Sequence, residues 1–421
     1  MNNIENIIKD GLCTGCGTCA GLCPHDIITM KIDYRKGLYV PNLLGICNDC
    51  GICVEVCPGH EVDFINLNKD IFGKQPDDLI LGNYLDCCIG NSSNNHIRTN
   101  SSSGGVVSEI LIFALENKII DGALVTKMKK DDPLKPEPFI AKTKEEIIEA
   151  SCDKYCPVPV NIGLKKILEA KEDKKFAVVG LPCHIHGIRK AEYLNETLKE
   201  KIILHIGLFC AYGVNFLATN YVLKERNIKK DTIEEIHYRK GNFPPGNALI
   251  KCNNNCINQI SHKKFWSLTF SFFTWFSPIR CTLCCDQTSE LADISVGGPR
   301  FPYLVYGNYN QSPIIIRNEF GEKILENAIH NQTVELKNIS EKDMSKLKEM
   351  QSYKKNQILA SGNLLKLFRK KNPKYSINGL VDPSIKTYID ALFLYIRTHI
   401  SESPRILNII NFIHFRRNFE K

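Results

Sequence analysis

Residues 13–24 read CTGCGTCAGLCP and residues 47–58 read CNDCGICVEVCP. Both blocks have the spacing C-x2-C-x2-C-x3-C-P, and a constant offset of 34 residues relates them. Three thiolates at C-x2-C spacing let a tight turn wrap one face of a 4Fe-4S cube, whereas the thiolate before proline points to the neighbouring cube. The ligand sets are therefore predicted to cross. One cluster takes Cys13, Cys16, Cys19 and Cys57, and the other takes Cys47, Cys50, Cys53 and Cys23.

The alternatives for these two blocks are zinc knuckles or disulfides. Zinc sites use four ligands with one short gap per pair, not three evenly spaced thiols followed by Cys-Pro. Gly15, Gly17 and Gly51 suit loops whose backbone N–H groups approach the sulfides closely. Over roughly residues 8–68 the pattern resembles the bacterial two-cluster ferredoxin. Such a module carries single electrons and by itself specifies no substrate.

The whole chain has a globular composition. It has 421 residues, of which 43% are hydrophobic and 24% charged, so two or three domains are expected. Nineteen cysteines are too few for a small disulfide scaffold and instead suggest metal binding in a reducing compartment. No uncharged apolar run is long enough for a membrane span, and the start MNNIENIIKDGLC does not resemble a signal peptide. We therefore expect a cytoplasmic protein.

The charge is concentrated near the C-terminus. The formal net charge is +8, and the last 61 residues carry 11 basic and four acidic side chains. The rest is close to neutral and has no nucleic-acid-binding module, so no nucleic-acid partner is expected. Basic clusters alternate with apolar helical stretches from Leu364 to Phe415. They predict either a solvated basic face packed on its own domain, or peripheral contact with an anionic membrane or a partner subunit.

After Asn66 the pattern changes to alternating apolar strands and amphipathic helices. Strands are predicted near 123–125, 175–180 and 202–209, and helices at 106–116, 161–170 and 214–226. The predicted fold class is α+β. It comprises a ferredoxin-like domain at 1–70, a larger mixed α/β domain at 71–350 and a basic helical tail at 351–421.

Two further patterns are ambiguous by themselves. Residues 101–105, SSSGG, run directly into a predicted helix, which fits either a phosphate-binding helix N-terminus or an ordinary N-cap. Cys281 and Cys284 form a C-x2-C pair, and Cys183 and Cys210 lie next to predicted strands. These four fit either a further metal site or buried cysteines, and their spacing does not separate zinc from iron–sulfur.

Taken in order, these segments resemble the family of coenzyme F420 hydrogenase/dehydrogenase beta subunits. The resemblance covers about residues 80–345. It rests on SSSGGVVSEILIFALENKIIDGALV, DKYCPVPVN, VVGLPCHIHGIRK, IGLFCAYG, IRCTLCCDQTSELADISVGG and IIIRNEFGEKILENA.

The resemblance implies an FAD-binding domain with its own 4Fe-4S cluster. That third cluster falls on Cys183, Cys210, Cys281 and Cys284, and leaves Cys285 outside the ligand set. The FAD phosphates fall nearest to Ser103, Gly104 and Gly105, and Lys154 and Tyr155 match a Lys-Tyr pair beside the flavin. The family commonly has Gly before that pair, whereas this chain has Cys152 and Asp153, which reshapes the loop and partly neutralises Lys154.

The function implied is an iron–sulfur flavoprotein oxidoreductase that moves electrons between coenzyme F420, FAD and the clusters. Its partner is a ferredoxin or a partner redox subunit. Hydride transfer needs no side-chain acid, base or nucleophile, so no catalytic residue is assigned. The long tail leaves two alternatives: a ferredoxin-dependent reductase of another organic substrate, such as a glycan biosynthesis intermediate, or a non-catalytic electron-transfer subunit.

Several other residues carry open interpretations. His184 and His186 fit either proton relay or a supporting role, and Arg239 and Lys240 either bind an anion or are solvated. Asp286 is expected to order the loop of the third cluster. The aromatic stretch 265–276 predicts a flavin cover or a buried helix, and the remaining thiols are expected to bind no metal: Cys87, Cys88, Cys152, Cys156, Cys252 and Cys256.

Overall fold

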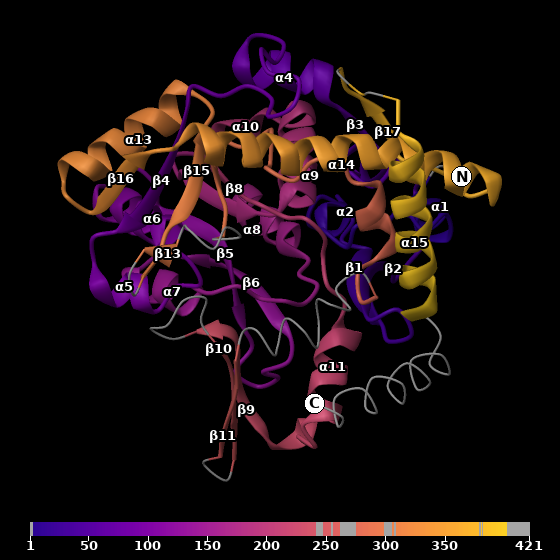
Figure 1. Cartoon of the computed structure of the whole chain (residues 1–421), viewed down its shortest axis with the longest axis horizontal. Coiled ribbons are helices and arrows are strands. Elements are labelled where there is room, and N and C mark those ends of the chain that lie inside the picture. Colours follow the sequence, from indigo (N-terminus) through magenta and orange to yellow (C-terminus); the bar gives the residue numbers. More distant parts are fainter. Residues whose placement is uncertain are drawn as a thin grey trace.

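The computed structural model describes residues 3–240, 247–253, 256–261, 275–298, 305–306, 309–378, 380 and 382–401. Figure 1 shows a central sheet with helices on both faces, and an N-terminal segment of short elements beside it. This arrangement confirms a mixed α/β domain preceded by a ferredoxin-like segment.

The N-terminal segment is built from short helices and one hairpin. Strands β1 and β2 pair antiparallel, with Ile28 opposite Leu43 and Asp33 opposite Leu38. The elements are α1 (Ile4–Lys9), α2 (Thr18–Gly21), β1 (Ile28–Asp33), β2 (Leu38–Leu43), α3 (Ile52–Glu55), β3 (Glu61–Asp63) and α4 (Phe64–Phe72). Helix α4 spans the boundary predicted at residue 70.

The central sheet has eight strands in the described part of the chain, in the order β16-β4-β15-β12-β8-β7-β5-β6. Neighbouring strands from β12 to β5 are parallel, and the outer pairs are antiparallel. The strands are β4 (Asp86–Ser92), β5 (Gly122–Met128), β6 (Pro136–Ala141), β7 (Phe176–Gly180), β8 (Ile202–Leu208), β12 (Ile294–Val296), β15 (Ser312–Ile316) and β16 (Val334–Asn338).

Alternating side chains on the central strands bury both faces of this sheet. Ala123 and Val125 of β5 lie in the core with Ile110 of α6, whereas Leu124 lies in a second core with Ile185 of α9. The helices around the sheet are α5 (Asn95–Thr99), α6 (Val106–Glu116), α7 (Lys144–Glu149), α8 (Leu164–Leu168), α9 (Pro182–Leu194), α10 (Glu196–Lys201) and α13 (Glu319–His330), with the 3-10 turn η1 at Val160–Gly163.

The helix predicted at 106–116 is confirmed with the same bounds, and the three predicted strands correspond to β5, β7 and β8. The helix predicted at 161–170 is divided into η1 and α8.

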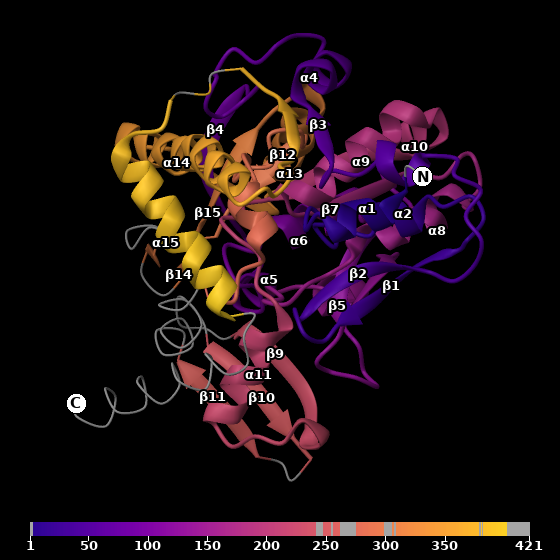
Figure 2. The same cartoon turned by 90° about the vertical axis from the view of Figure 1, so that its right-hand side faces the viewer.

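A small lobe projects from one end of the molecule (Figures 1 and 2). It consists of helix α11 (Phe216–Glu225), a 3-10 turn (Lys230–Thr232) and an antiparallel sheet of β9 (Ile233–Lys240), β10 (Asn247–Cys252) and β11 (Ile257–Ser261). Its core contains Val222, Tyr238 and Ile250. Two short strands, β13 (Val305–Tyr306) and β14 (Tyr309–Asn310), form a separate pair.

The C-terminal region returns to the ferredoxin-like segment. Helix α14 (Glu341–Leu367) continues through the predicted boundary at residue 350 and is followed by β17 (Lys374–Ser376) and α15 (Ile385–Ser401). Strand β17 pairs in parallel with β3, and Leu365 of α14 lies in one core with Ile4 and Leu12. The start of the predicted tail is thus folded against the N-terminal segment, and residues 402–421 lie outside the described residues.

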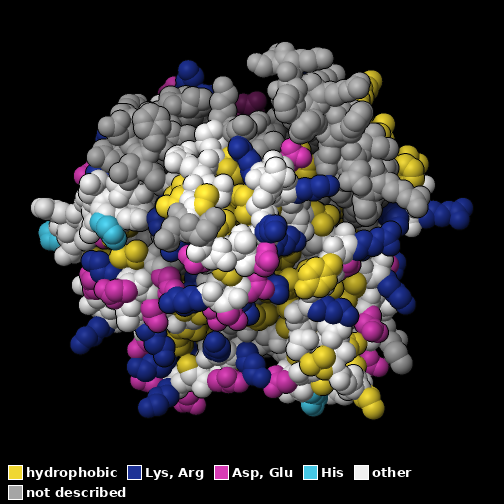
Figure 3. Space-filling view, turned by 90° about the horizontal axis from the view of Figure 1, so that it is seen from below, with side chains coloured by type: hydrophobic (Ala, Val, Ile, Leu, Met, Phe, Trp, Pro, Cys, Tyr) yellow, Lys and Arg dark blue, Asp and Glu magenta, His cyan; other side chains and the backbone are white. Residues whose placement is uncertain are grey.

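No helix among the described residues is long and apolar enough to cross a bilayer. Figure 3 shows basic and acidic side chains interspersed over the described part of one face.

A buried polar network joins the sheet to α9. The Asp293 carboxylate accepts hydrogen bonds from Arg189 Nη2 (2.7 Å), His205 Nδ1 (2.9 Å) and Asn318 Nδ2 (2.7 Å). Burial alone would raise the pKa of this carboxyl, but Arg189 and His205 outweigh burial and hold the pKa well below its usual range. The network therefore depends on a negative charge at residue 293.

We expect Asp293→Asn to destabilise the fold by about 3 kcal/mol, because the buried guanidinium of Arg189 loses one of its two carboxylate partners and keeps only Glu192. Chemical denaturation of the iron-loaded protein measures this change. Asp26→Asn is the control, since Asp26 forms an exposed ion pair with Lys165 and its loss should cost less than about 1 kcal/mol. Equal effects of the two substitutions would contradict this account.

Candidate iron–sulfur centres

The two N-terminal cysteine blocks have the same local geometry. Gly15 and Asp49, which the offset of the repeat places at equivalent positions, have positive φ angles of 70° and 55°. The backbone N–H of Gly15 donates to Cys13 Sγ and that of Asp49 to Cys47 Sγ, both at 3.4 Å. The following glycines, Gly17 and Gly51, also have positive φ. Both turns thus place an N–H beside the first thiol of the block.

The first thiol set comprises Cys13, Cys16, Cys19 and Cys57. Burial, together with neighbouring thiolates of the same set, raises the pKa of Cys13 to about 12 and that of Cys57 to about 11. The pKa of Cys19 is raised well above its usual range by burial and by the thiolates of Cys16, Cys13 and Cys57. Thiolates gathered in an apolar interior need a compensating cation. The donor set therefore fits a group that brings positive charge.

The buried hydroxyl of Thr14, between two of these cysteines, has no hydrogen-bond partner among the described residues. A sulfide of a bound cube would be able to accept a hydrogen bond from it. Within the described ranges no three His, Cys, Asp or Glu side chains converge closely enough to hold a single ion. A cube carries its irons at separate corners, so its thiolates do not have to converge on one point.

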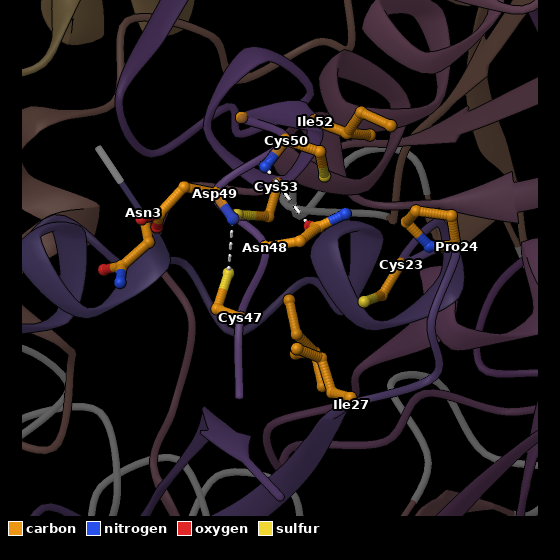
Figure 4. A pocket seen from close by; sticks show the side chains of 12 residues that line it. Asn3, Cys23, Pro24, Ile27, Cys47, Asn48, Asp49, Cys50, Ile52 and Cys53 are labelled. Carbon is orange, nitrogen blue, oxygen red and sulfur yellow. Dashed lines mark hydrogen bonds between the residues drawn. The ribbon is translucent and has the colours of Figure 1, made fainter. Parts of the chain in front are cut away.

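The second thiol set lies nearer the surface. Cys23, Cys47, Cys50 and Cys53 line a cavity of about 340 Å³ that is partly open to solvent. Figure 4 shows the four side chains around it, with Asn48 and Ile27 between them. Burial raises the pKa of Cys53, and the thiolates of Cys47, Cys50 and Cys23 add to that shift. Cys50 is exposed, as is Ile46 beside the block.

The third thiol set is assembled from three separate segments. Cys183 is in the first turn of α9, and Cys210 follows β8. Cys281 lies in the 3-10 turn η3 (Ile279–Leu283), and Cys284 directly follows it. Burial raises the pKa of Cys183 well above its usual range, and its charged neighbours include Cys210, Cys284 and Cys281. The N–H of Gly213 donates to Cys281 Sγ at 3.4 Å, as the N–H groups do in the N-terminal blocks.

The residues after Cys284 hold the loop in place. Cys285 is fully buried in the core on the α9 side of the sheet. The Asp286 carboxylate accepts from the N–H groups of Thr288 and Glu290, both at 2.9 Å, and lies 2.8 Å from Nε2 of the buried His186. This agrees with the loop-ordering role expected of Asp286.

The ring of His184 is held by backbone groups on both sides. Its Nδ1 accepts the N–H of Leu181 at 3.1 Å, and its Nε2 is 3.0 Å from the carbonyl of Val158. Burial lowers the pKa of His184 to about 4. The neutral ring thus has both nitrogens engaged, and both histidines support the cluster loops.

The three thiol sets lie in series. Among the thiolates that raise the pKa of Cys183 in the third set, Cys16 of the first set has the largest effect, and Cys53 of the second set contributes to the raised pKa of Cys19. Asn161, which is completely buried, joins the first and third sets. Its Nδ2 donates to Thr18 Oγ1 (2.8 Å) and to the carbonyl of His184 (2.9 Å), and its N–H donates to the carbonyl of Cys16 (2.9 Å).

Asn161 could not be identified from the sequence, because an asparagine in an apolar stretch carries no motif. The surroundings of Asn161 are closely packed. A Cβ on Gly187 of α9 would lie 2.3 Å from Thr18 Oγ1.

The SSSGG turn meets the loop around Lys154. Ser102 Oγ donates to the carbonyl of Arg239 (3.2 Å) and accepts the N–H of Asp153 (2.7 Å). The Asp153 carboxylate accepts from Tyr155 Oη and Arg239 Nη1, both at 3.2 Å. Residues from three distant segments thus converge beside the N-terminus of α6.

Several of the residues predicted to bind the flavin already form hydrogen bonds with other groups of the protein. Lys154 Nζ donates to the carbonyls of Ala150, Ser151 and Cys152, and burial lowers the pKa of Lys154 to about 8. Ser103 Oγ lies 2.7 Å from Ser312 Oγ. A Cβ on Gly104 would lie 2.5 Å from the carbonyl oxygen of Gly90, so packing already requires this glycine.

At the N-terminus of α6, Gly105 has φ of +77° and makes no side-chain cap, so the first helical N–H groups receive no side-chain acceptor from it. The chain therefore offers backbone N–H groups to an anion here.

The remaining predicted features are distributed over the structure. Cys87 and Cys88 are buried on β4, and Cys152 Sγ donates to the carbonyl of Asn100 at 2.9 Å. Cys252 ends β10, and the exposed Cys256 directly precedes β11. Residues 262–274, which hold most of the aromatic stretch 265–276, lie outside the described residues.

Comparison with known proteins agrees with this description. Residues 12–63 match a 4Fe-4S dicluster domain, and the protein is therefore an iron–sulfur protein. Residues 87–165 match the N-terminal part, and residues 173–342 the C-terminal part, of the family described as coenzyme F420 hydrogenase/dehydrogenase, beta subunit. These two matches together cover more than half of the chain. The protein belongs to this family, and its relatives described below are oxidoreductases.

Similar proteins include the coenzyme F420 hydrogenase subunit beta of Methanothermobacter thermautotrophicus, 27% identical over 62% of this chain and 88% of the relative. The F(420)H(2) dehydrogenase of Methanosarcina mazei has a subunit that is 26% identical over 76% of this chain and 83% of the relative. Among solved structures, a chain of the F420-reducing [NiFe] hydrogenase complex from Methanosarcina barkeri has a TM-score of 0.53 at 22% identity. The match covers 69% of this chain and 95% of that chain, and it shows a shared fold.

We expect the double variant Cys281→Ala/Cys284→Ala to lose about four of about twelve irons and to keep the two N-terminal clusters. Iron and sulfide analysis of anaerobically purified protein measures the loss. The matched control is Cys87→Ala/Cys88→Ala, because these buried thiols belong to none of the three sets. Unchanged iron in the first variant would rule out the third set as a cluster site.

Lys154 should give the protein a pH-dependent stability. Its pKa is about 8 in the folded state, and about 10.4 in an unfolded chain. The unfolded state therefore binds more protons between these values, and stability rises with pH across this window. Relative to Lys154→Met, the wild type should gain about 1–2 kcal/mol between pH 8 and pH 10. Thermal unfolding tests this, with Lys171→Met as the control at an exposed lysine. A difference that stays constant with pH would contradict the assignment.

Proposed function

We propose that the protein is an iron–sulfur flavoprotein that exchanges electrons between coenzyme F420 and a partner redox subunit or ferredoxin. Membership of the family of F420 hydrogenase/dehydrogenase beta subunits supports the substrate class. The observation that carries the proposal is the serial arrangement of the three thiol sets, third to first to second, which extends from the family domain to the protein surface.

The proposed cofactors are FAD and three 4Fe-4S clusters. When bound, FAD exchanges a hydride for single electrons, and each cluster holds one electron at a time. Cys13, Cys16, Cys19 and Cys57 would hold the first cluster, Cys23, Cys47, Cys50 and Cys53 the second, and Cys183, Cys210, Cys281 and Cys284 the third.

The group of loops that meet at the N-terminus of α6 is the proposed FAD site. Support comes from the uncapped first turn of α6, because free N–H groups and the positive end of the helix dipole favour phosphate. Arg239 lies beside this turn, and its charge is shared with Asp153. Ser103, Gly104 and Gly105 shape the turn, while Lys154 and Tyr155 hold the facing loop. In this arrangement Lys154 contributes by fixing the loop, since its ammonium is occupied by three carbonyls.

The second thiol set is the proposed point of contact with the redox partner. Cys50 is exposed, and Leu44 and Ile46 next to the block are 65% and 98% exposed. Apolar side chains around an accessible electron carrier fit a transient redox interface. Peripheral membrane contact through the basic tail and a cytoplasmic location stay predictions.

We expect reduced F420 to reduce the purified protein without any artificial mediator. Under anaerobic conditions the absorbance of the protein-bound flavin should fall, and electron paramagnetic resonance (EPR) signals of reduced clusters should appear. Two electrons should be taken up per molecule of reduced F420, because it donates a hydride. Chromatography of the released flavin identifies it as FAD or another flavin.

The variant Cys281→Ala/Cys284→Ala provides the internal control. Its flavin should still be reduced by F420, but its N-terminal clusters should be reduced at least tenfold more slowly because the intervening site is missing. If dithionite reduces the wild-type flavin and clusters while reduced F420 does not, the electron donor is a different molecule and the proposed substrate is wrong.

A further inference from the structure

Arg280 is a buried cation whose partners are all neutral. Its side chain, 4% exposed, is in η3 immediately before Cys281. Nε donates to the carbonyl of Leu12, Nη1 to that of Leu283, and Nη2 to that of Pro58, each at 3.1 Å. Nη2 also donates to Tyr375 Oη at 2.9 Å. Across the described part of the chain it forms no ion pair with a carboxylate.

These acceptors belong to the loops of two different thiol sets. Leu12 precedes Cys13 and Pro58 follows Cys57, and both cysteines belong to the first set. Leu283 lies between Cys281 and Cys284 of the third set. The positive charge of Arg280 also lowers the pKa of Cys13 and that of Cys281. One guanidinium therefore touches the backbone of both loops.

Two other cations near the thiols, the half-buried Lys190 and the buried Lys354, each contact the loops of one set only. Lys190 Nζ donates to the carbonyls of Cys57 (3.0 Å) and Glu61 (2.6 Å), beside the first set. Lys354 Nζ donates to the carbonyl of Cys281 (3.0 Å), beside the third set. These lysines are natural comparators for Arg280, because they carry the same charge to a single site.

A guanidinium buried without a carboxylate is costly unless an anion lies close to it. A 4Fe-4S cube with four thiolates is an anion, and its negative charge increases on reduction. A fixed positive charge beside such a cluster stabilises the reduced form and raises the reduction potential. A charge located between two clusters raises both potentials together.

We propose that Arg280 is a positioning residue shared by the first and third clusters, which fixes their loops against one another and holds both reduction potentials up. The proposal rests on the proposed function in one respect, namely that the third set binds a cluster. Electron transfer between these two sites oxidises one cluster and reduces the other by one electron. Because a shared charge raises both reduction potentials, it leaves the difference between them little changed.

The test is an EPR-monitored redox titration of the iron-loaded full chain, with mediators and without F420. The variants are Arg280→Gln, which removes the charge, and Arg280→Lys, which keeps it. Signals are assigned with Cys47→Ser and Cys284→Ser, which remove a ligand of the second and third sites. In Arg280→Gln we expect the ratio of reduced to oxidised cluster at a fixed potential to fall at least tenfold at both the first and third sites. A tenfold change corresponds to about 59 mV for one electron.

Three comparisons make the test specific. Arg280→Lys should retain most of both potentials, and Lys354→Met should shift the third site alone. Lys201→Met is the control, because Lys201 is equally buried and donates to the carbonyls of Ile167, Leu168 and Ala170, which belong to none of the thiol loops. Its potentials should not change.

A shift confined to the third site, or no shift in an iron-replete Arg280→Gln, would overturn the proposal. If Arg280→Gln loses iron, loss from both the first and third sites supports the shared role, whereas loss from one site refutes it. Absence of a third cluster in the wild type would instead refute the proposed function. Failure of F420 to reduce the protein leaves this test unaffected.

Discussion

Burial of negative charge on sulfur is the constraint on which the rest of this structure depends. Thiols such as Cys13 and Cys57 lie in an interior that strongly disfavours their ionised form. Three cations near the thiols, namely the buried Arg280 and Lys354 and the half-buried Lys190, donate to backbone carbonyls next to the cysteines. The sulfurs thus keep their lone pairs for metal, while the loops that carry them are held by charge-assisted hydrogen bonds.

The same arrangement explains why the ferredoxin-like segment is part of a larger unit. Its residues share hydrophobic cores with α9, α14 and the η3 turn, and Asn161 bonds to both sides of the junction. A freely tethered ferredoxin would sample many distances from the α/β domain. Here the packing fixes one distance between the first and third thiol sets, which suits a path for single electrons.

The cysteine spacing allowed a great deal to be predicted, because metal ligation imposes strict local geometry. The repeat indicated both N-terminal sets, and the structure places the members of each set near one another. The helix at 106–116 and the strands β5, β7 and β8 also followed from periodicity, whereas β6, α7, α9 and α10 were not predicted. In contrast, the central role of Arg280 could not be predicted, since its acceptors are carbonyls of Leu12 and Pro58 that are far away in sequence and carry no side-chain signature. The contacts of Lys154 could not be predicted for a similar reason, because its partners are backbone carbonyls of its own loop.

The parallel pairing of β17 with β3 joins two segments that are about 300 residues apart in the sequence and are therefore synthesised at different times. Both cysteine repeats, which are complete by residue 58, are synthesised before the central sheet and before β17. Strand β3 gains its partner only when residues 374–376 have been synthesised, and Arg280 gains Tyr375 at the same stage. The segment that contains both cysteine repeats is therefore complete in sequence before these contacts, which hold it against the rest of the fold, can form.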